Sequence, residues 1–237
     1  MKAIKKFIRF VLLVLIIAIA VLIFFGRQFY KDTIKEVPLS TKIEEVRENY
    51  TFVKKENLPK DYLNAIVAVE DRRFYKHGPV DYFGILRAVY SNIKSKGLQE
   101  GGSTLTQQVA KNLYFESEKS IFKRKVAEIF IAYDLEKNYS KDDILELYAN
   151  IIYFGDGYYG IYEACHGYLD KDPKDMNLSE STMMAGIPNA PSAYAPTVNK
   201  NLCKSRQKKV ISSMVYNKYI TQEQADSIDQ SFIDKIK

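Results

Sequence analysis

The stretch LPKDYLNAIVAVEDRRFYKH (residues 58–77) decides the fold class, because an apolar helical run in it ends abruptly in ionisable residues. Pro59 stands near the first turn, where a missing backbone N–H costs nothing, and apolar residues recur at helical spacing up to Glu70. From Glu70 to His77 the stretch holds two carboxylates, three cations and a histidine. Such a cluster at the end of an apolar helix predicts a helical domain with a functional site at that end.

Outward from this stretch, helical patterns and their start signals continue almost to the C-terminus. The predicted helices run from a cap at Asp81 to Gly97, from a cap at Ser103 or Thr104 to Leu113, from Ser120 to Asn138, over 141–151 and 161–168, from a cap at Ser179 to Gly186, and as two more helices, the last opened by the capping box Thr221–Gln224. Pro188, Pro191 and Pro196 predict a loop before those two. The sequence therefore predicts a mainly α domain over residues 58–237.

Residues 1–26 are typical of a cytoplasmic tip and a transmembrane anchor. Residues 10–26 carry no charge and, with their apolar neighbours, approach the ~20 residues needed to cross a hydrocarbon core. A cytoplasmic N-terminus and an exported remainder are predicted by the basic residues in front, Lys2, Lys5, Lys6 and Arg9. A cleaved signal peptide is the alternative, although residues 24–27 form a poor cleavage site. Residues 27–57 are interpreted as a juxtamembrane connector with a short strand at 50–53.

Net charge, cysteine and histidine content narrow the classes of function. For an exported domain, a formal charge of +6 favours anionic lipid headgroups or a phosphorylated substrate over nucleic acid, and a basic solvated face is the alternative. Cys165 and Cys203 lack metal-ligand spacing, so we expect buried free thiols, with one disulfide as the alternative. His77 and His166 are the only histidines, which excludes a polyhistidine metal centre and leaves any other metal set unknown.

Glu70 is the first candidate for acid–base chemistry. It ends an apolar helix, so its carboxylate has a fixed position from which it can face a cleft, as a general base requires. The structural alternative is a helix-end ion pair with Arg72 or Arg73.

Glu128 is the second candidate, because it lies inside the apolar stripe of the helix predicted over 120–138. A charge in that place needs a partner or a chemical task. Arg124 and Lys125 precede it by one turn, so a structural ion pair is the alternative. With Lys111, these two cations would suit a diphosphate, since arginine offers a planar fork and lysine a point charge.

The segment GGSTLTQQVAKN (residues 101–112) is the third candidate. Its two glycines let the backbone approach a ligand, and Ser103 and Thr104 stand at the positive end of a predicted helix. Lys111 follows two glutamines by one turn on the same face. By itself, Gly-Gly-Ser-Thr is a common helix start.

The helix predicted over 82–96 has two interpretations. Packing in a core is the favoured one. In the other, Phe83, Leu86 and Tyr90 face lipid while Lys94 and Lys96 face phosphates, as in a membrane-dipping helix.

With these residues assembled, the chain resembles the peptidoglycan glycosyltransferases of family 51, in their monofunctional biosynthetic form, over roughly residues 50–225. Five motifs occur in order: Glu70-Asp71-x-x-Phe74-x-x-His77 with Asp81, GGSTLTQQxxKN at 101–112, Arg124-Lys125-x-x-Glu128, Lys141-x-x-Ile144-Leu145-Glu146-x-Tyr148-x-Asn150, and AGIPNAPSAYAP at 185–196. The sequence departs from the family pattern at Pro79 and Ala149 and within 168–171. Because the chain ends soon after the fifth motif, we expect no transpeptidase domain.

The resemblance implies a lysozyme-like glycosyltransferase domain with a small membrane-associated lobe, and a residue-level mechanism. Glu70 would take the proton from the 4-hydroxyl of the acceptor sugar, with inversion at the donor MurNAc anomeric carbon and a β-1,4 link as product. Glu128 would orient cations, bind metal or assist the leaving group, undecaprenyl diphosphate. Substrate-binding roles are implied for Asp71, Arg72, Phe74, His77, Ser103, Thr104, Gln107, Gln108, Lys111, Asn112, Arg124 and Lys125.

The resemblance also implies partners and a location. The substrates would be lipid II and the growing lipid-linked glycan, in contact with the membrane and with cell-wall synthesis proteins, and not with nucleic acid. A divalent cation such as Mg²⁺ is the one cofactor implied, and no organic cofactor is expected. The protein would cross the bacterial cell membrane once, with its catalytic domain on the outer face.

Two other functions stay open at this point. A lysozyme-like hydrolase would use an acidic residue on a similar scaffold, although it has no diphosphate for the cations to hold. A catalytically inactive, membrane-anchored scaffold for wall synthesis would need neither the acidic nor the basic residues.

Overall fold

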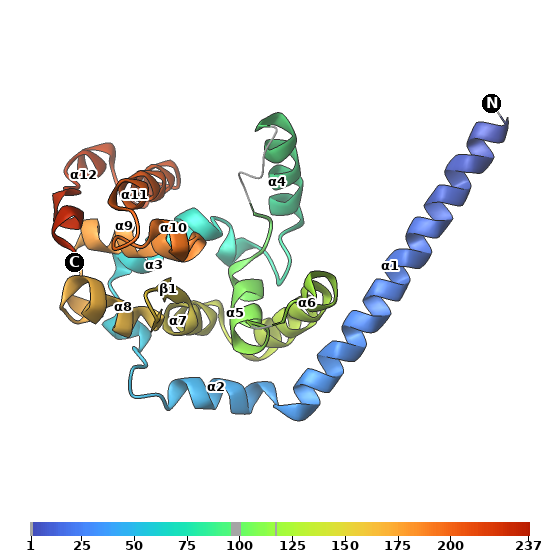
Figure 1. Cartoon of the computed structure of the whole chain (residues 1–237), viewed down its shortest axis with the longest axis horizontal. Coiled ribbons are helices and arrows are strands. Elements are labelled where there is room, and N and C mark those ends of the chain that lie inside the picture. Colours follow the sequence, from blue (N-terminus) through green and yellow to red (C-terminus); the bar gives the residue numbers. More distant parts are fainter. Residues whose placement is uncertain (1, 96–100, 117) are drawn as a thin grey trace.

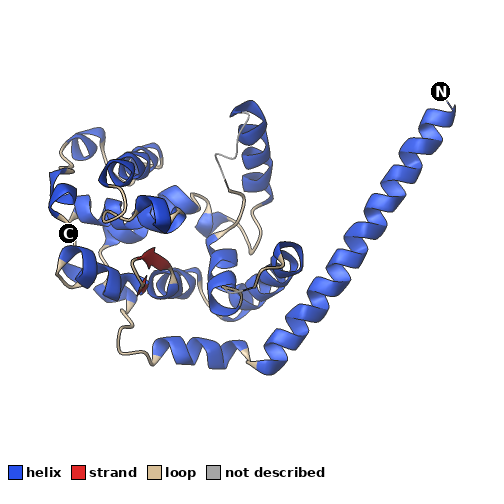
Figure 2. Ribbon diagram, in the orientation of Figure 1, coloured by secondary structure: helices blue, strands red, loops and turns tan. Residues whose placement is uncertain are grey.

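The computed structural model describes residues 2–95, 101–116 and 118–237, and it confirms a mainly α architecture (Figures 1 and 2). The helices are α1 (Lys2–Glu36), α2 (Leu39–Arg47), α3 (Lys60–Glu70), α4 (Tyr82–Ser95), α5 (Leu105–Tyr114), α6 (Ile121–Asn138), α7 (Lys141–Ile151), α8 (Gly160–Leu169), α9 (Leu178–Gly186), α10 (Pro191–Tyr194), α11 (Lys200–Tyr216) and α12 (Gln222–Asp226). Short 3-10 turns are η1 (Lys55–Asn57), η2 (Phe74–Lys76), η3 (Pro173–Asp175), η4 (Ile187–Asn189) and η5 (Ser231–Lys235). Strands β1 (Tyr153–Gly155) and β2 (Tyr158–Tyr159) pair as an antiparallel hairpin between the helices predicted over 141–151 and 161–168.

Helix α1 extends away from the rest of the molecule (Figure 1). Its 35 residues span about 52 Å at 1.5 Å per residue, more than a hydrocarbon core of about 30 Å requires. Within the described residues it is the one helix that is long and apolar enough to cross a membrane. Nearly all its large apolar side chains between Ile4 and Phe25 are exposed, so this part needs a lipid environment.

The C-terminal third of α1 packs against α6. Gly26 allows the approach, because a Cβ at this position would lie 2.4 Å from the Cβ of Val126. One helical turn later, the Tyr30 ring stacks on Phe130 and its hydroxyl donates to Asp134 Oδ2 (2.6 Å). The anchor is therefore joined to the helix that carries Arg124 and Lys125 by direct side-chain packing.

The connector is more ordered than the sequence suggested. Helix α2 buries Leu39 and Ile43 in the common core. The strand predicted at 50–53 is wrong, because the amide side chain of Asn150 binds both the N–H and the C=O of Val53, which a strand partner would otherwise have bound. The domain limits 1–26, 27–57 and 58–237 stay a prediction.

The core surrounds α3, which packs on α9 and α11, while α5 packs on α6 and α7. Fully buried side chains from several of these elements fill it, including Tyr62, Phe74, Leu105, Ile131, Leu145 and Tyr148. Cys165 and Cys203 are buried free thiols, as expected. This packing fixes the ends of α3, α5, α6 and α11 around one opening.

The helix starts agree with the sequence in most places. Thr104 caps α5 by accepting the Gln107 N–H, and capping boxes open α7 and α12. The cap predicted at Ser179 is wrong. Asn177, the residue immediately before α9, is the N-cap, and it forms a capping box with Glu180 in the first turn of the helix. The proline loop contains the short elements η4 and α10.

Helix α4 stands apart from the helices packed around α3 (Figure 1). Its outward face is exposed and apolar, and consists of Tyr82, Phe83, Leu86, Val89, Tyr90 and Ile93. Core packing is therefore the wrong interpretation of this face. Lys96 and the predicted end at Gly97 lie outside the described residues.

Candidate active site

A cleft of about 790 Å³ opens between the C-terminal end of α3 and helices α5, α6 and α11. It gathers residues that lie far apart in the sequence. The predicted site residues that line it are Glu70, Arg72, Ser103, Gln108, Lys111, Asn112, Arg124, Lys125 and Glu128. Both candidate carboxylates and all the candidate diphosphate-binding cations therefore share one opening.

Glu70 is held from two sides at the end of α3. Arg206 Nη2 donates to Glu70 Oε1 (2.9 Å), and Gln108 Nε2 donates to Glu70 Oε2 (3.2 Å). The side chains of Glu70 and Arg206 are only 10% and 6% exposed, so the pair is poorly screened by solvent. The ion pair with Arg72 or Arg73 that the sequence suggested is not formed in the described structure, because Arg206 occupies that role.

Arg206 is a cleft residue that the sequence motifs did not single out. It also donates from Nε to the Gly186 carbonyl (3.2 Å), which fixes the guanidinium plane between α9 and α11. A signal was present in the sequence: Arg206 lies three residues after Cys203 and four before Val210, on the apolar face of α11. The reasoning applied to Glu128, that a charge in an apolar stripe needs a partner, applies equally to Arg206.

Glu128 lies beneath two of the cations and is almost completely buried. Lys125 Nζ lies 2.9 Å from Glu128 Oε2 and also donates to Ser103 Oγ (2.8 Å). Arg124 Nε lies 3.0 Å from Glu128 Oε1, but the two atoms are not aligned as a hydrogen bond, so this contact is an ion pair. The structural alternative for Glu128 is therefore realised, and the pair also orients two cations at the cleft wall.

Lys111 differs from these cations, because among the described residues it has no ion-pair partner and its side chain is exposed in the cleft. Its charge is available to a ligand. On the opposite wall, Lys209 lines the cleft and Arg72 stacks its guanidinium 5.5 Å from the centre of the Tyr216 ring.

Five predicted site residues do not line the cleft but support it: Asp71, Phe74, His77, Thr104 and Gln107. Phe74 is fully buried. Asp71 Oδ1 lies 2.7 Å from His77 Nε2, and Asp71 Oδ2 accepts the Leu105 N–H (3.1 Å). The carboxylate therefore ties the loop after Glu70 to the start of α5.

Hydrogen bonds to Pro79 complete that attachment. Its carbonyl accepts from Thr104 Oγ1 (2.9 Å) and from Gln107 Nε2 (3.2 Å). Since the loop uses the carbonyl of residue 79 and not its N–H, a proline is compatible with this position. These residues act on the cleft by positioning Glu70 and α5.

The environment of His77 favours its protonated form. Burial by itself lowers the pKa of His77, but hydrogen bonds to Asp71 and to the Gly78 carbonyl raise that pKa above its ordinary value. Without another ligand, both ring nitrogens therefore donate, to Asp71 Oδ1 and to the Gly78 oxygen.

Replacing Arg206 by glutamine should lower the free energy of unfolding by about 3–5 kcal/mol, because it leaves the Glu70 carboxylate buried without its counter-ion. Chemical denaturation of the detergent-solubilised chain measures this. Arg47→Gln is the matched control, since its pair with Asp143 is 38% and 39% exposed and should be worth less than about 1 kcal/mol. Equal losses for the two variants would contradict the assigned ion pair.

Comparison with known proteins identifies the family. The sequence model of the transglycosylase family matches residues 36–215. Penicillin-binding protein 1A of Neisseria lactamica is 49% identical to this chain, over 74% of this chain and 22% of its own length. Penicillin-binding protein 1F of Bacillus subtilis is 40% identical, over 93% of this chain and 33% of its own length. A crystal structure of penicillin-binding protein 1A from Haemophilus influenzae is similar over 75% of this chain and 17% of that one, with 22% identity and a TM-score of 0.45. The chain thus spans between a fifth and a third of the length of these curated relatives, and it belongs to the transglycosylase family, glycosyltransferase family 51.

Proposed function

We propose that the chain is a peptidoglycan glycosyltransferase that polymerises lipid II into β-1,4-linked glycan strands and releases undecaprenyl diphosphate. The family assignment supports the reaction class. The observation that carries the proposal is that Glu70, Lys111, Arg124 and Lys125 line one cleft. A proton acceptor and a set of cations are the two requirements of a glycosyl transfer with a diphosphate leaving group.

Glu70 is the general base in this proposal. Gln108 and Arg206 together fix both oxygens of its carboxylate. Each carboxylate oxygen keeps a further lone pair for a proton. The carboxylate therefore accepts the proton of the acceptor's 4-hydroxyl while that oxygen attacks the anomeric carbon of the donor from the face opposite the diphosphate, which inverts the configuration.

The cations stabilise the leaving group. Negative charge grows on the diphosphate as the glycosidic bond breaks, and fixed positive groups aimed at that place are worth more in a cleft than in water. Glu128 holds Arg124 and Lys125 in position. Both of its oxygens already contact cations, so Glu128 does not fit as a metal ligand, and we derive no step through the expected Mg²⁺.

The membrane supplies the substrate in this proposal. Helix α1 would cross the bilayer with its N-terminus in the cytoplasm, and the apolar face of α4 would enter the outer leaflet. Ile121 and Phe122 at the start of α6 are also exposed, next to the cations of the third motif. The lipid tail of the substrate would then stay in the bilayer while its diphosphate reaches the cleft.

The test is to incubate the purified, detergent-solubilised chain with labelled lipid II and to separate the products on a gel. We expect a ladder of glycan strands and release of undecaprenyl diphosphate. In a parallel reaction with finished glycan we expect no cleavage. Cleavage of finished glycan without a ladder would indicate a hydrolase, and no turnover of either substrate would support an inactive scaffold.

A further inference from the structure

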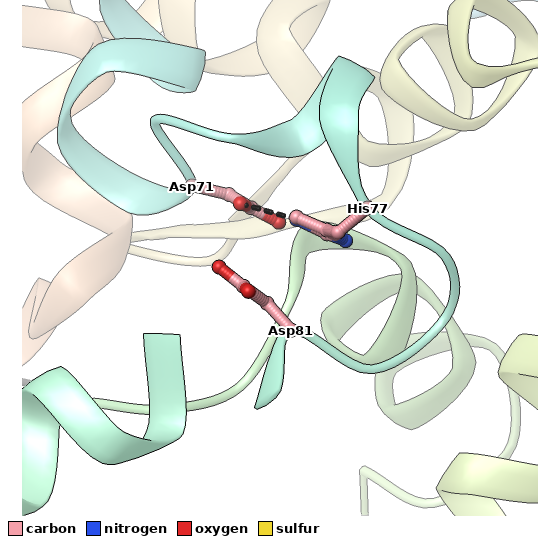
Figure 3. A group of neighbouring side chains, drawn as sticks. All are labelled: Asp71, His77 and Asp81. Carbon is pink, nitrogen blue, oxygen red and sulfur yellow. Dashed lines mark hydrogen bonds and ion pairs between the residues drawn. The ribbon is translucent and has the colours of Figure 1, made fainter. Parts of the chain in front are cut away.

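Among the described residues, one cluster of acidic and histidine side chains has potential ligand atoms that all lie within 4.8 Å of one another: Asp71, His77 and Asp81 (Figure 3). The first two come from the loop between α3 and α4, and Asp81 immediately precedes α4. None of the three lines the cleft. Figure 3 shows the two carboxylates and the imidazole converging on one another.

The oxygen atoms of Asp81 are the unexplained part of this cluster. Its side chain is 9% exposed, its nearest cation is Arg73 with Nε 3.8 Å from Oδ2, and its Oδ1 has no hydrogen-bond partner. Buried polar atoms are almost always satisfied, so Asp81 Oδ1 needs a partner that the described residues do not supply. A cation in this cluster would supply it.

The outer partners of the three side chains match those of a metal site. The Gly78 carbonyl accepts from His77 Nδ1, which leaves Nε2 as the ligating nitrogen, and a backbone carbonyl is a usual partner for the second nitrogen of a metal-bound histidine. The Leu105 N–H holds one oxygen of Asp71, and Arg73 stands beside Asp81. Each proposed ligand is thus oriented by a neighbour of its own.

We propose that Asp71, His77 and Asp81 bind a divalent first-row transition ion such as Zn²⁺ or Mn²⁺, which fastens the loop after Glu70. One imidazole and two carboxylates suit these ions better than Mg²⁺, which prefers oxygen ligands alone. On binding, the ion takes the lone pair of His77 Nε2, the proton shared with Asp71 leaves to solvent, and water completes the coordination. This site is separate from the diphosphate cleft, and its existence does not depend on the proposed function.

The experiment is metal retention by the full-length chain in detergent. After chelation, Zn²⁺, Mn²⁺ or Mg²⁺ is added singly, unbound ion is removed by gel filtration, and bound metal is measured by mass spectrometry. We expect one Zn²⁺ or Mn²⁺ per chain, a higher melting temperature with the ion, and little retained Mg²⁺. Asp81→Asn should weaken retention at least about tenfold and abolish the thermal shift.

His166→Gln is the matched control, because it removes the other histidine, whose partner Asp172 lies 3.2 Å away in an exposed pair. It should retain the ion as the wild type does. Wild-type protein without stoichiometric metal, equal retention by Asp81→Asn, or loss in His166→Gln would each overturn the proposal. Pulsed electron paramagnetic resonance of the Mn²⁺-loaded wild type decides the matter even if Asp81→Asn does not fold, since an ion without a coordinated imidazole nitrogen would also refute it.

Discussion

Glu70→Gln should abolish the polymerisation of lipid II, with a loss of turnover of at least about 10²–10⁴-fold, because general-base catalysis contributes that much and glutamine cannot accept the proton. The substitution keeps the shape of the side chain. Its amide oxygen can still accept from Arg206, and the Gln108 amide can rotate to accept from its NH₂ group. Binding of a polyprenyl diphosphate should therefore stay near the wild-type value.

Glu180→Gln is the matched control for this variant. Glu180 is also buried and paired, with Lys171 Nζ 2.7 Å from Oε1, but it caps α9 and does not line the cleft. Gel analysis with labelled lipid II compares the two variants, and unfolding temperatures confirm that both are folded. Turnover of Glu70→Gln near the wild-type rate would reject Glu70 as the base.

Lys111→Ala should lower turnover by about 10²–10³-fold, the cost of about 2.7–4 kcal/mol for one lost donor to a charged transition state. Lys111 has no ion-pair partner among the described residues, so its removal leaves no carboxylate unpaired and should hardly affect folding. The same variant should bind a water-soluble polyprenyl diphosphate more weakly, and the difference from wild type should shrink as salt is added.

Lys208→Ala tests whether this loss reflects position and not net charge. Lys208 is exposed on α11 outside the cleft, so its removal changes the total charge equally. Calorimetric titration of each variant with the diphosphate ligand gives the comparison. Unchanged affinity in Lys111→Ala, or an equal loss in Lys208→Ala, would refute the assigned contact.

Local signals predicted most of the fold. The α6 and α7 limits differ from the predicted ones by at most one residue, because capping at Ser140 and apolar periodicity depend on residues within a few positions of each other. The cap of α9 was misplaced although Asn177 and Glu180 have the spacing of a capping box. The strand at 50–53 failed for another reason, since a side chain 97 residues away binds the backbone of Val53.

The sequence predicted most of the residues of the site but not how they are arranged in space. Glu70, Lys111 and Glu128 were recognised by charge in an apolar setting and by the motifs that contain them. Arg206 lies on α11, and only the packing of α3 on α11 brings it into the site. Its distance along the chain from Glu70 is 136 residues, which no short motif covers.

The order of residues along this chain determined the helices, the apolar anchor and the presence of an acid and several bases at helix ends, because each of these depends on neighbours within about one or two turns. The tertiary structure decided which charges meet. In it, Glu70 pairs with Arg206, Glu128 pairs with Arg124 and Lys125, and Lys111 is left exposed in the cleft, where a ligand can reach it. The physical reason is that ion pairs form between side chains that the core brings together. The core forms by burying apolar faces against one another, and these faces are far apart in the sequence.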